Sequence, residues 1–219
     1  MDQKIIDLYD AYTHGALGVA SSWIASRPAV LVVHENRGLN PHIRDVARRL
    51  GVEGFLAFAV DALSPLGGTP ADEDKAREMI GTLDRDETLR RIAAAVPFLA
   101  AHPESNGKVG AVGFCWGGAM ANRLAAAGTS LAASVAYYGM PLPAEEVPKV
   151  TAALLLHYAG LDERINAGMA AYEAALKANG RRTSSTCTRA PTTPSTTTRT
   201  RPATTRPRPT WPGAGRSPS

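Results

Sequence analysis

The sequence has no apolar run that approaches the length of a membrane span, which needs about 20 consecutive apolar residues in a helix. Its first residues also lack the basic stretch followed by an apolar stretch that marks a secretory signal. We therefore expect a cytoplasmic protein with no membrane partner. With 219 residues, of which 44% are hydrophobic, the chain is long enough for one domain with a substantial core.

Cysteine is scarce, because the chain has only Cys115 and Cys187. Two cysteines without an export signal fit a reducing compartment better than a disulfide. The histidines and carboxylates lack metal-ligand spacings such as H-E-x-x-H. The pair Gly67-Gly68 is not followed by the Lys and Ser or Thr of a phosphate-binding loop. We therefore expect no metal and no cofactor.

Acidic residues are absent after residue 180, and eight arginines lie in the last 39 residues. Residues 1–180 hold 16 Lys and Arg against 20 Asp and Glu. This net negative charge does not suggest a nucleic-acid partner. A basic tail could serve as an arm for nucleic acid or an anionic surface, but it contains no lysine and no repeat.

The segment 181–219 is built mainly from Thr, Arg, Pro and Ser and has no Leu, Ile, Val or Phe. Such a segment cannot bury enough apolar surface to offset its ordering entropy. We therefore predict a disordered tail over residues 181–219. The first 27 residues are poorly patterned, which leaves residues 28–180 as the expected folded core.

Apolar runs alternate with helical patterns through this core. The expected strands cover residues 29–34, 54–60, 107–113, 131–138 and 152–157, and the expected helices cover residues 42–50, 71–83, 86–101, 116–127 and 166–178. Continuous short apolar runs are typical of strands buried on both faces. The alternation predicts an α/β fold, in which helices cover both faces of a mostly parallel sheet.

One predicted junction of strand and helix reads Gly113-Phe114-Cys115-Trp116-Gly117. This is the nucleophile-elbow pattern G-x-S-x-G with cysteine in place of serine. An elbow places its nucleophile on a tight turn, where the helix N-terminus favours a thiolate and offers a backbone N–H to an oxyanion. The alternative is a buried structural cysteine. The glycines on both sides favour a nucleophile.

Three segments, in this order, resemble the dienelactone hydrolase family: HENRGLNPHIRDVARRL, VGFCWGGAM and LLLHYAGLDERI. The resemblance covers about residues 28–180. It implies an α/β-hydrolase-like sheet that here lacks the first strands and the final strand and helix. It also implies a carboxymethylenebutenolidase-like enzyme without a cofactor. Such an enzyme cleaves a small ester or lactone through a cysteine nucleophile and a thioester intermediate.

The resemblance also assigns roles to individual residues. It implies that Cys115 is the nucleophile, that Asp162 is the triad acid, and that Glu35 is the carboxylate that contacts the resting thiol. The backbone N–H groups of Asn36 and Trp116 match the oxyanion hole. Plainer roles stay open: Asp162 could be a helix N-cap, Glu35 a solvated carboxylate and Asn36 part of a turn.

The family's substrate-carboxylate arginines have no clear counterpart in this sequence. Lys75 and Arg77 lie near one such region, but a solvated helix face explains them equally well. The natural substrate and the oligomeric state are therefore not predicted.

The triad histidine of the family follows the acid, but no histidine follows Asp162 here. All five histidines precede it: His14, His34, His42, His102 and His157. The missing histidine, strand and helix all fall after residue 180, which favours a changed reading frame near codon 181 over an evolved tail. We therefore expect a hydrolase with impaired activity. The alternative is a non-catalytic or degenerate protein with the α/β-hydrolase fold.

Overall fold

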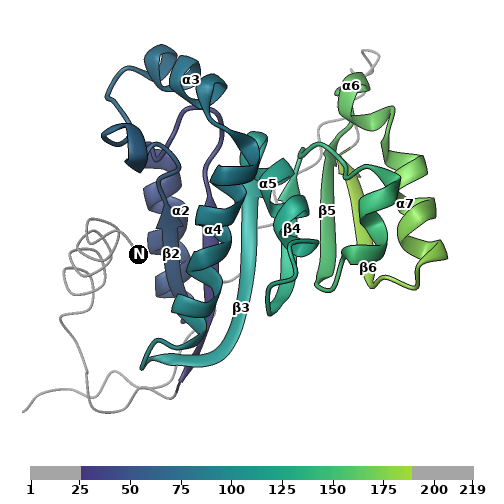
Figure 1. Cartoon of the computed structure of the whole chain (residues 1–219), viewed down its shortest axis with the longest axis horizontal. Coiled ribbons are helices and arrows are strands. Elements are labelled where there is room, and N and C mark those ends of the chain that lie inside the picture. Colours follow the sequence, from purple (N-terminus) through teal and green to yellow (C-terminus); the bar gives the residue numbers. More distant parts are fainter. Residues whose placement is uncertain (1–25, 189–219) are drawn as a thin grey trace, which may run out of the picture.

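The computed structural model describes residues 26–188, so the expectations for residues 1–25 and 189–219 lie outside the described residues. A six-stranded sheet has the order β2-β1-β3-β4-β5-β6, and every neighbouring pair is parallel (Figure 1). The strands are β1 (Arg27–Val33), β2 (Leu56–Val60), β3 (Ser105–Phe114), β4 (Leu131–Tyr137), β5 (Ala153–Ala159) and β6 (Thr183–Thr188). The predicted α/β fold with a parallel sheet is confirmed.

Most of the α-helices begin where the sequence supplies a capping side chain. They are α2 (Pro41–Val52), α3 (Glu73–Thr82), α4 (Arg85–Ala100), α5 (Trp116–Ala125), α6 (Glu163–Asn166) and α7 (Met169–Ala178), with short 3₁₀ turns at Ser64–Leu66 and Ala144–Lys149. The Asn40 side chain accepts a hydrogen bond from the Ile43 N–H at 3.1 Å, and Asp84 accepts one from the Glu87 N–H at 2.7 Å. Such caps satisfy N–H groups that the first helical turn leaves unpaired.

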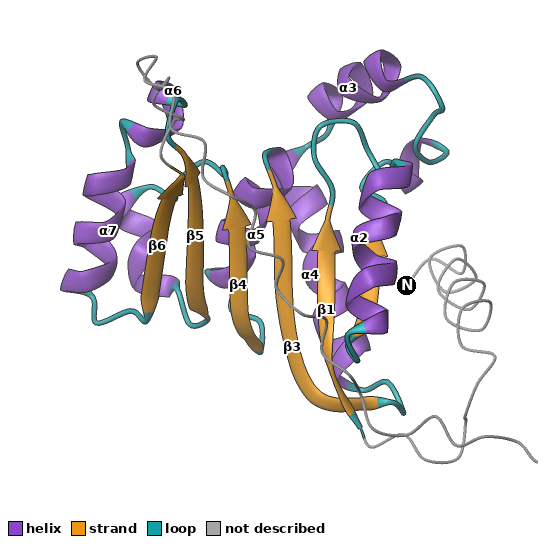
Figure 2. Cartoon of the chain, turned by 180° about the vertical axis from the view of Figure 1, so that it is seen from behind, coloured by secondary structure: helices purple, strands orange, loops and turns teal. Residues whose placement is uncertain are grey.

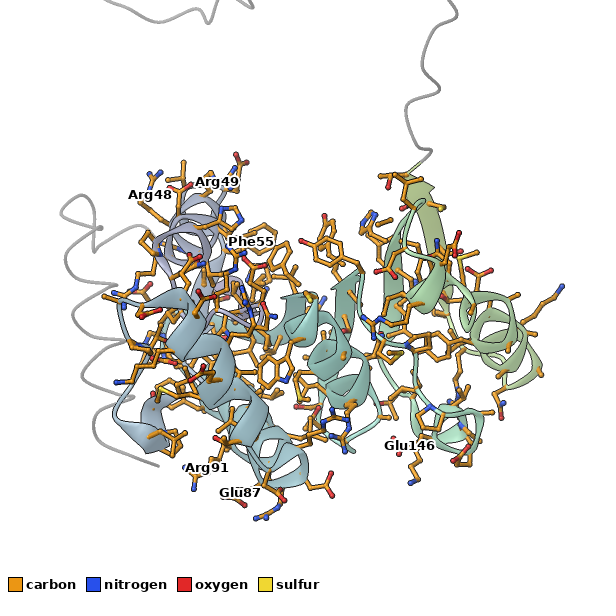
Figure 3. The ribbon with its side chains drawn as sticks, turned by 90° about the horizontal axis from the view of Figure 1, so that it is seen from above. Arg48, Arg49, Phe55, Glu87, Arg91 and Glu146 are labelled. Atoms are coloured by element: carbon orange, nitrogen blue, oxygen red, sulfur yellow. The ribbon has the colours of Figure 1, made fainter. Side chains whose placement is uncertain are left out.

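Helices lie on both sides of the sheet, but they cover the two faces unequally. Helix α2 lies over β1 and β2 on one side, and α4 and α5 lie behind the sheet (Figure 2). Viewed from above, Arg48 and Arg49 of α2 and Glu87 and Arg91 of α4 point outward on opposite sides (Figure 3). The larger core lies on the α4 and α5 side, where Leu31, Leu99, Leu124, Leu156 and Leu176 are almost fully buried.

One expectation is wrong: order does not end at residue 180. Strand β6 pairs with β5, although all its side chains are exposed. Its pairing needs only backbone groups and hydroxyls, as when the Leu154 N–H donates to the Arg182 carbonyl at 2.9 Å and the Thr188 hydroxyl to the Tyr158 carbonyl at 3.1 Å. Threonine favours extended backbone, so the absence of apolar residues did not exclude a strand over residues 183–188.

Within residues 26–188, no helix combines the length and the apolar character that a membrane crossing requires. The parallel strands all end at the same edge of the sheet, at the top of Figure 1. In open α/β sheets, ligands bind outside the carboxyl ends of the strands. The loops that follow β1, β3, β4 and β5 therefore position the candidate site.

Candidate active site

Cys115 lies between the end of β3 and the start of α5, at the carboxyl edge of the sheet. Its φ of 53° and ψ of −112° are unusual for a residue other than glycine. The strained backbone is held on both sides, because the Cys115 N–H donates to the Tyr137 carbonyl at 2.9 Å and the Cys115 carbonyl accepts from the Ala119 N–H at 3.1 Å. The structure therefore has a sharp elbow at this cysteine, as the sequence predicted.

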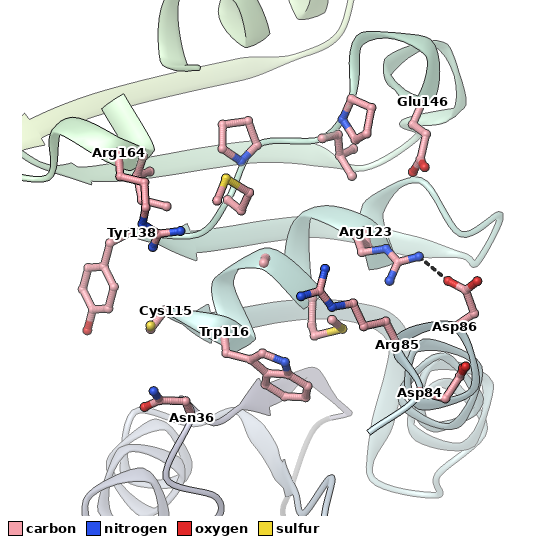
Figure 4. Close-up of a pocket in the computed structure, with 17 residues that line it drawn as sticks. Asn36, Asp84, Arg85, Asp86, Cys115, Trp116, Arg123, Tyr138, Glu146 and Arg164 are labelled. Atoms are coloured by element: carbon pink, nitrogen blue, oxygen red, sulfur yellow. Dashed lines mark hydrogen bonds and ion pairs between the residues drawn. The ribbon is translucent and has the colours of Figure 1, made fainter. Parts of the chain in front are cut away.

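A pocket of about 700 Å³ opens beside this elbow. Cys115, Asn36 and Trp116 line it together (Figure 4). Trp116 is the first residue of α5, so its backbone N–H has no partner within the helix. The two predicted oxyanion-hole residues thus lie at one pocket with the half-buried cysteine.

Glu35 follows β1 and is half-buried. It lies near Tyr138, which also lines the pocket. Burial raises the pKa of the Tyr138 hydroxyl, and the negative charges of Glu35 and Cys115 raise it further. The Glu35 carboxylate and the Cys115 sulfur are therefore close enough to Tyr138 to affect the pKa of its hydroxyl.

Asp162 lies after β5, at the same edge of the sheet. Its side chain accepts a hydrogen bond from the Ile165 N–H at 3.0 Å and caps α6. The plainer role that the sequence left open is therefore present. Asp162 does not line the pocket, whereas its neighbours Arg164 and Ile165 do. Any triad role would be additional to this capping role.

No histidine of the described residues lines the Cys115 pocket, and His14 lies outside them. His157 lies at the end of β5, where its Nδ1 is 2.6 Å from the Thr186 hydroxyl and its ring stacks on Tyr137 at 4.4 Å. His42 is exposed at the start of α2, and the His102 Nδ1 accepts from the Glu104 N–H after α4. His102 and His157 thus make local contacts, and none of these three histidines lines the pocket with the thiol.

The pocket contains arginines that sequence reasoning missed. Arg85, Arg123 and Arg164 all line it, whereas Lys75 and Arg77 on α3 do not. Arg123 pairs with Asp86 at 2.5 Å across the gap between α5 and α4 (Figure 4). Sequence signals could have found two of them: Arg164 lies two residues after the motif aspartate, and Arg123 lies two helical turns after the elbow.

His34 contacts Trp116, the residue that follows Cys115. It is fully buried, its Nε2 accepts from the Ala62 N–H at 3.0 Å, and its Nδ1–H donates to the Glu35 carbonyl at 2.6 Å. This arrangement fixes a neutral imidazole. The ring also stacks on Trp116 at 5.4 Å. It therefore links the end of β1 to the loop after β2 and to the first residue of α5.

Burial lowers the pKa of His34 below 6.5, and outweighs the nearby carboxylates of Asp61 and Glu35, which raise it. The unfolded chain therefore binds a proton at His34 before the folded chain does. We expect the free energy of unfolding to fall as the pH falls below about 6.5, by up to about 1.4 kcal/mol per pH unit. Urea unfolding at pH 7.5 and 5.5 measures this loss.

The matched control for this pH dependence is His42→Gln, which removes an exposed histidine at the start of α2. It should keep the loss of stability, whereas His34→Gln should remove it at some cost in stability at pH 7.5. An unchanged slope in His34→Gln would show that other groups cause the loss.

No cluster of three or more His, Cys, Asp or Glu side chains with the geometry of a metal site occurs within residues 26–188. The groups that line the pocket include a thiol, a phenol, carboxylates and arginines. A thiol at a helix N-terminus, in a pocket that Asn36 and Trp116 also line, is suited to attack on a carbonyl carbon.

Comparisons with known proteins show which family the chain belongs to. The family model described as dienelactone hydrolase family matches residues 15–185. The carboxymethylenebutenolidase of Pseudomonas putida is 34% identical over 171 residues, which cover 74% of this chain and 72% of that protein. The hydrolase fragment YghX of Escherichia coli (strain K12) is 58% identical over 57 residues, covering 26% of this chain and 49% of that fragment.

The fold agrees as well. The crystal structure of a dienelactone hydrolase homologue from Klebsiella pneumoniae subsp. pneumoniae superposes with a TM-score of 0.67 at 25% identity, covering 76% of this chain and 75% of that chain. The family match spans most of the described residues and includes the elbow, the pocket and the loops after β1 and β5. The chain belongs to the dienelactone hydrolase family.

Proposed function

We propose that this chain is a carboxylic-ester hydrolase whose Cys115 thiolate attacks a small ester or lactone. The observation that carries the proposal is the position of this cysteine. It occupies a strained turn at the N-terminus of α5 and faces a pocket of about 700 Å³. A pocket of this volume is in the range of small-molecule sites.

The first half of the reaction uses groups that line the pocket and Glu35, which lies near the pocket residue Tyr138 but does not line the pocket itself. Glu35 takes the thiol proton, and the thiolate sulfur attacks the carbonyl carbon. The N–H groups of Asn36 and Trp116 stabilise the resulting oxyanion, which forms at the positive end of the α5 dipole. The carbon–oxygen bond to the leaving alcohol then breaks, the alcohol takes up the proton, and a thioester on Cys115 remains.

The second half of the reaction lacks a well-placed base. Hydrolysis of the thioester needs a group that removes a proton from water as the water attacks. Asp162 could orient a histidine from its place after β5, but no described histidine lines the pocket. We therefore infer that the chain acylates and then turns over slowly. The alternative, a non-catalytic protein with this fold, is favoured by the same absence.

The test is a reaction with p-nitrophenyl acetate in large excess. We expect a burst of p-nitrophenol close to one equivalent per chain, followed by a slow steady rate, and an acetyl group on Cys115 in the intact mass. Cys115→Ala removes the burst because the nucleophile is gone. Cys187→Ala keeps it, since Cys187 is an exposed cysteine on β6.

This experiment distinguishes the cysteine hydrolase from the non-catalytic protein. A burst that persists in Cys115→Ala contradicts the proposed nucleophile. The absence of any burst in the unaltered chain favours the non-catalytic alternative. A fast, sustained rate that depends on Cys115 supports Cys115 as the nucleophile, but it contradicts the inference that the chain lacks a base for thioester hydrolysis.

A further inference from the structure

One face of the sheet is left largely open by the described helices. From β3 to β6, no described helix lies over the face on which α2 packs (Figure 2). A groove of about 550 Å³ follows this face between α2 and β5. Its floor is apolar: Val30, Val112, Phe114, Val135, Tyr137 and Leu155 line it and are all half-buried.

The open face has the composition of a buried one. Parallel sheets normally have both faces covered, and large exposed apolar surfaces mark sites of interaction. The rings of Phe114 and Tyr137 stack at 5.1 Å, and Tyr137 stacks on His157 at 4.4 Å, which forms a flat aromatic row across three strands. A partner with an apolar face of its own would fit this row.

We propose that residues 3–16 of this same chain pack on the groove. The first reason is where that segment joins the described structure. Residues 1–25 connect directly to β1, and Pro28, Ala29 and Val30 at its start line the groove. The nine residues from 17 to 25 can span up to about 30 Å when extended. This reach is enough to return residues 3–16 over the face.

The second reason is the spacing of apolar residues in that segment. Although residues 1–27 show no strand pattern, Ile5, Leu8, Tyr9 and Tyr12 recur at the spacing of one helix face. Gln3, Asp7, Asp10 and His14 fall on the opposite side of the same helical projection.

The dimensions also match. Fourteen residues in a helix extend about 21 Å. Strands β1, β4 and β5 each have seven residues, which corresponds to about 23 Å. A helix over residues 3–16 would therefore cover the length of the groove.

The other end of the chain does not offer such a face. Residues 189–219 contain no Leu, Ile, Val or Phe, and Trp211 is their one large apolar side chain. A second copy of the chain is the remaining occupant, and the experiment distinguishes it.

The first test places charge on the apolar face of the segment in the full chain. In Leu8→Asp/Tyr12→Asp the segment should leave the groove, and the fluorescence of the apolar dye 1-anilinonaphthalene-8-sulfonate should rise several-fold. The matched control Gln3→Asp/His14→Asp adds the same number of acidic side chains to the opposite face and should leave the dye signal unchanged. Equal dye signals in the two variants would overturn the proposal.

The second test measures proximity. Leu8→Cys is combined with Ala133→Cys, an exposed position at the groove, in a chain carrying Cys115→Ser and Cys187→Ser. A short bis-maleimide should link the two cysteines within one chain. The control pair Asp10→Cys and Ala133→Cys should link far less, because the proposed packing turns residue 10 away from the groove. A link between two chains would instead identify a second copy as the occupant, and no link at all would also overturn the proposal.

Discussion

A one-base insertion in the gene near codon 181 is expected to raise the steady-state rate of ester hydrolysis by about 10²–10⁴-fold, the usual contribution of a positioned general acid and base. Under the frame hypothesis, the inserted base replaces residues 181–219 by a sequence that carries a histidine after Asp162. That histidine could accept the proton of the water that attacks the thioester on Cys115. The measurement is the steady rate after the p-nitrophenol burst, with the burst itself unchanged.

The genetic code already restricts what this neighbouring frame encodes. The frame combines the third base of each codon with the first two bases of the next. Codons 186 and 187, for Thr and Cys, then give a codon ending in TG, which encodes Leu, Met or Val. Codons 187 and 188, for Cys and Thr, give TAC or CAC, which encode Tyr or His. At these two junctions the neighbouring frame therefore encodes an apolar residue followed by Tyr or His, where β6 now has Thr, Cys and Thr.

A histidine is allowed a few codons later in the same frame. Codons 192 and 193 both encode Thr, so their junction encodes Tyr, His, Asn or Asp. The next junction encodes a small residue or Pro. The junction of codons 194 and 195, for Pro and Ser, encodes Phe, Leu, Ile or Val when the serine codon begins with TC. This pattern allows a histidine two positions before an apolar or aromatic residue, in a segment that follows Asp162 as the resemblance requires.

The control is the same corrected gene with the new histidine codon changed to glutamine. It should keep the burst and lose the faster steady rate. DNA that encodes no histidine in the neighbouring frame would end the frame hypothesis. A corrected chain that folds, carries the histidine and still turns over slowly would show that the loss of activity has another cause.

The sequence predicted the elbow because its information is local. A tight turn between a strand and a helix needs small residues near the nucleophile. The five residues from Gly113 to Gly117 contain both the cysteine and these glycines. The strands were equally readable, since buried parallel strands are continuous apolar runs. The six-residue strand β6 was missed because its order comes from backbone pairing with β5 and not from its own side chains.

The pocket was less predictable than the elbow. Arg85, Arg123 and Arg164 come from three elements far apart in the chain, and only the packing of α4, α5 and α6 brings them to one cavity. The structural role of His34, which contacts Ala62 and Trp116, could not be predicted from the sequence either. In the sequence it is a histidine beside Glu35, whereas its burial and its bond to the Ala62 N–H depend on the loop after β2.

Replacing Gly117 by alanine is expected to lower the free energy of unfolding by at least about 3 kcal/mol, at the upper end of overpacking costs. A Cβ at this position would lie 2.3 Å from the His34 carbonyl oxygen and 2.4 Å from that of Val33. Both oxygens belong to the backbone at the carboxyl end of β1 and cannot rotate away. Urea unfolding at pH 7.5 measures the effect.

The matched control is Gly81→Ala in α3, where a Cβ meets no atom within 4 Å. Alanine favours a helix interior over glycine, so this variant should gain about 0.5–1 kcal/mol. Opposite signs for the same substitution would show that the cost at position 117 comes from close packing and not from the loss of a glycine. Equal effects in the two variants would contradict the predicted clash.

The contact at Gly117 also connects stability to the chemistry. A Cβ at Gly113 would lie 2.0 Å from the Gly117 carbonyl oxygen, so glycine is required on both sides of Cys115. This close approach presses the first turn of α5 against the end of β1. Trp116, the first residue of this turn, lines the pocket together with Asn36, which follows the same end of β1. A folded Gly117→Ala chain should therefore acylate more slowly than the unaltered chain, because any backbone shift that relieves the clash also moves the Trp116 N–H.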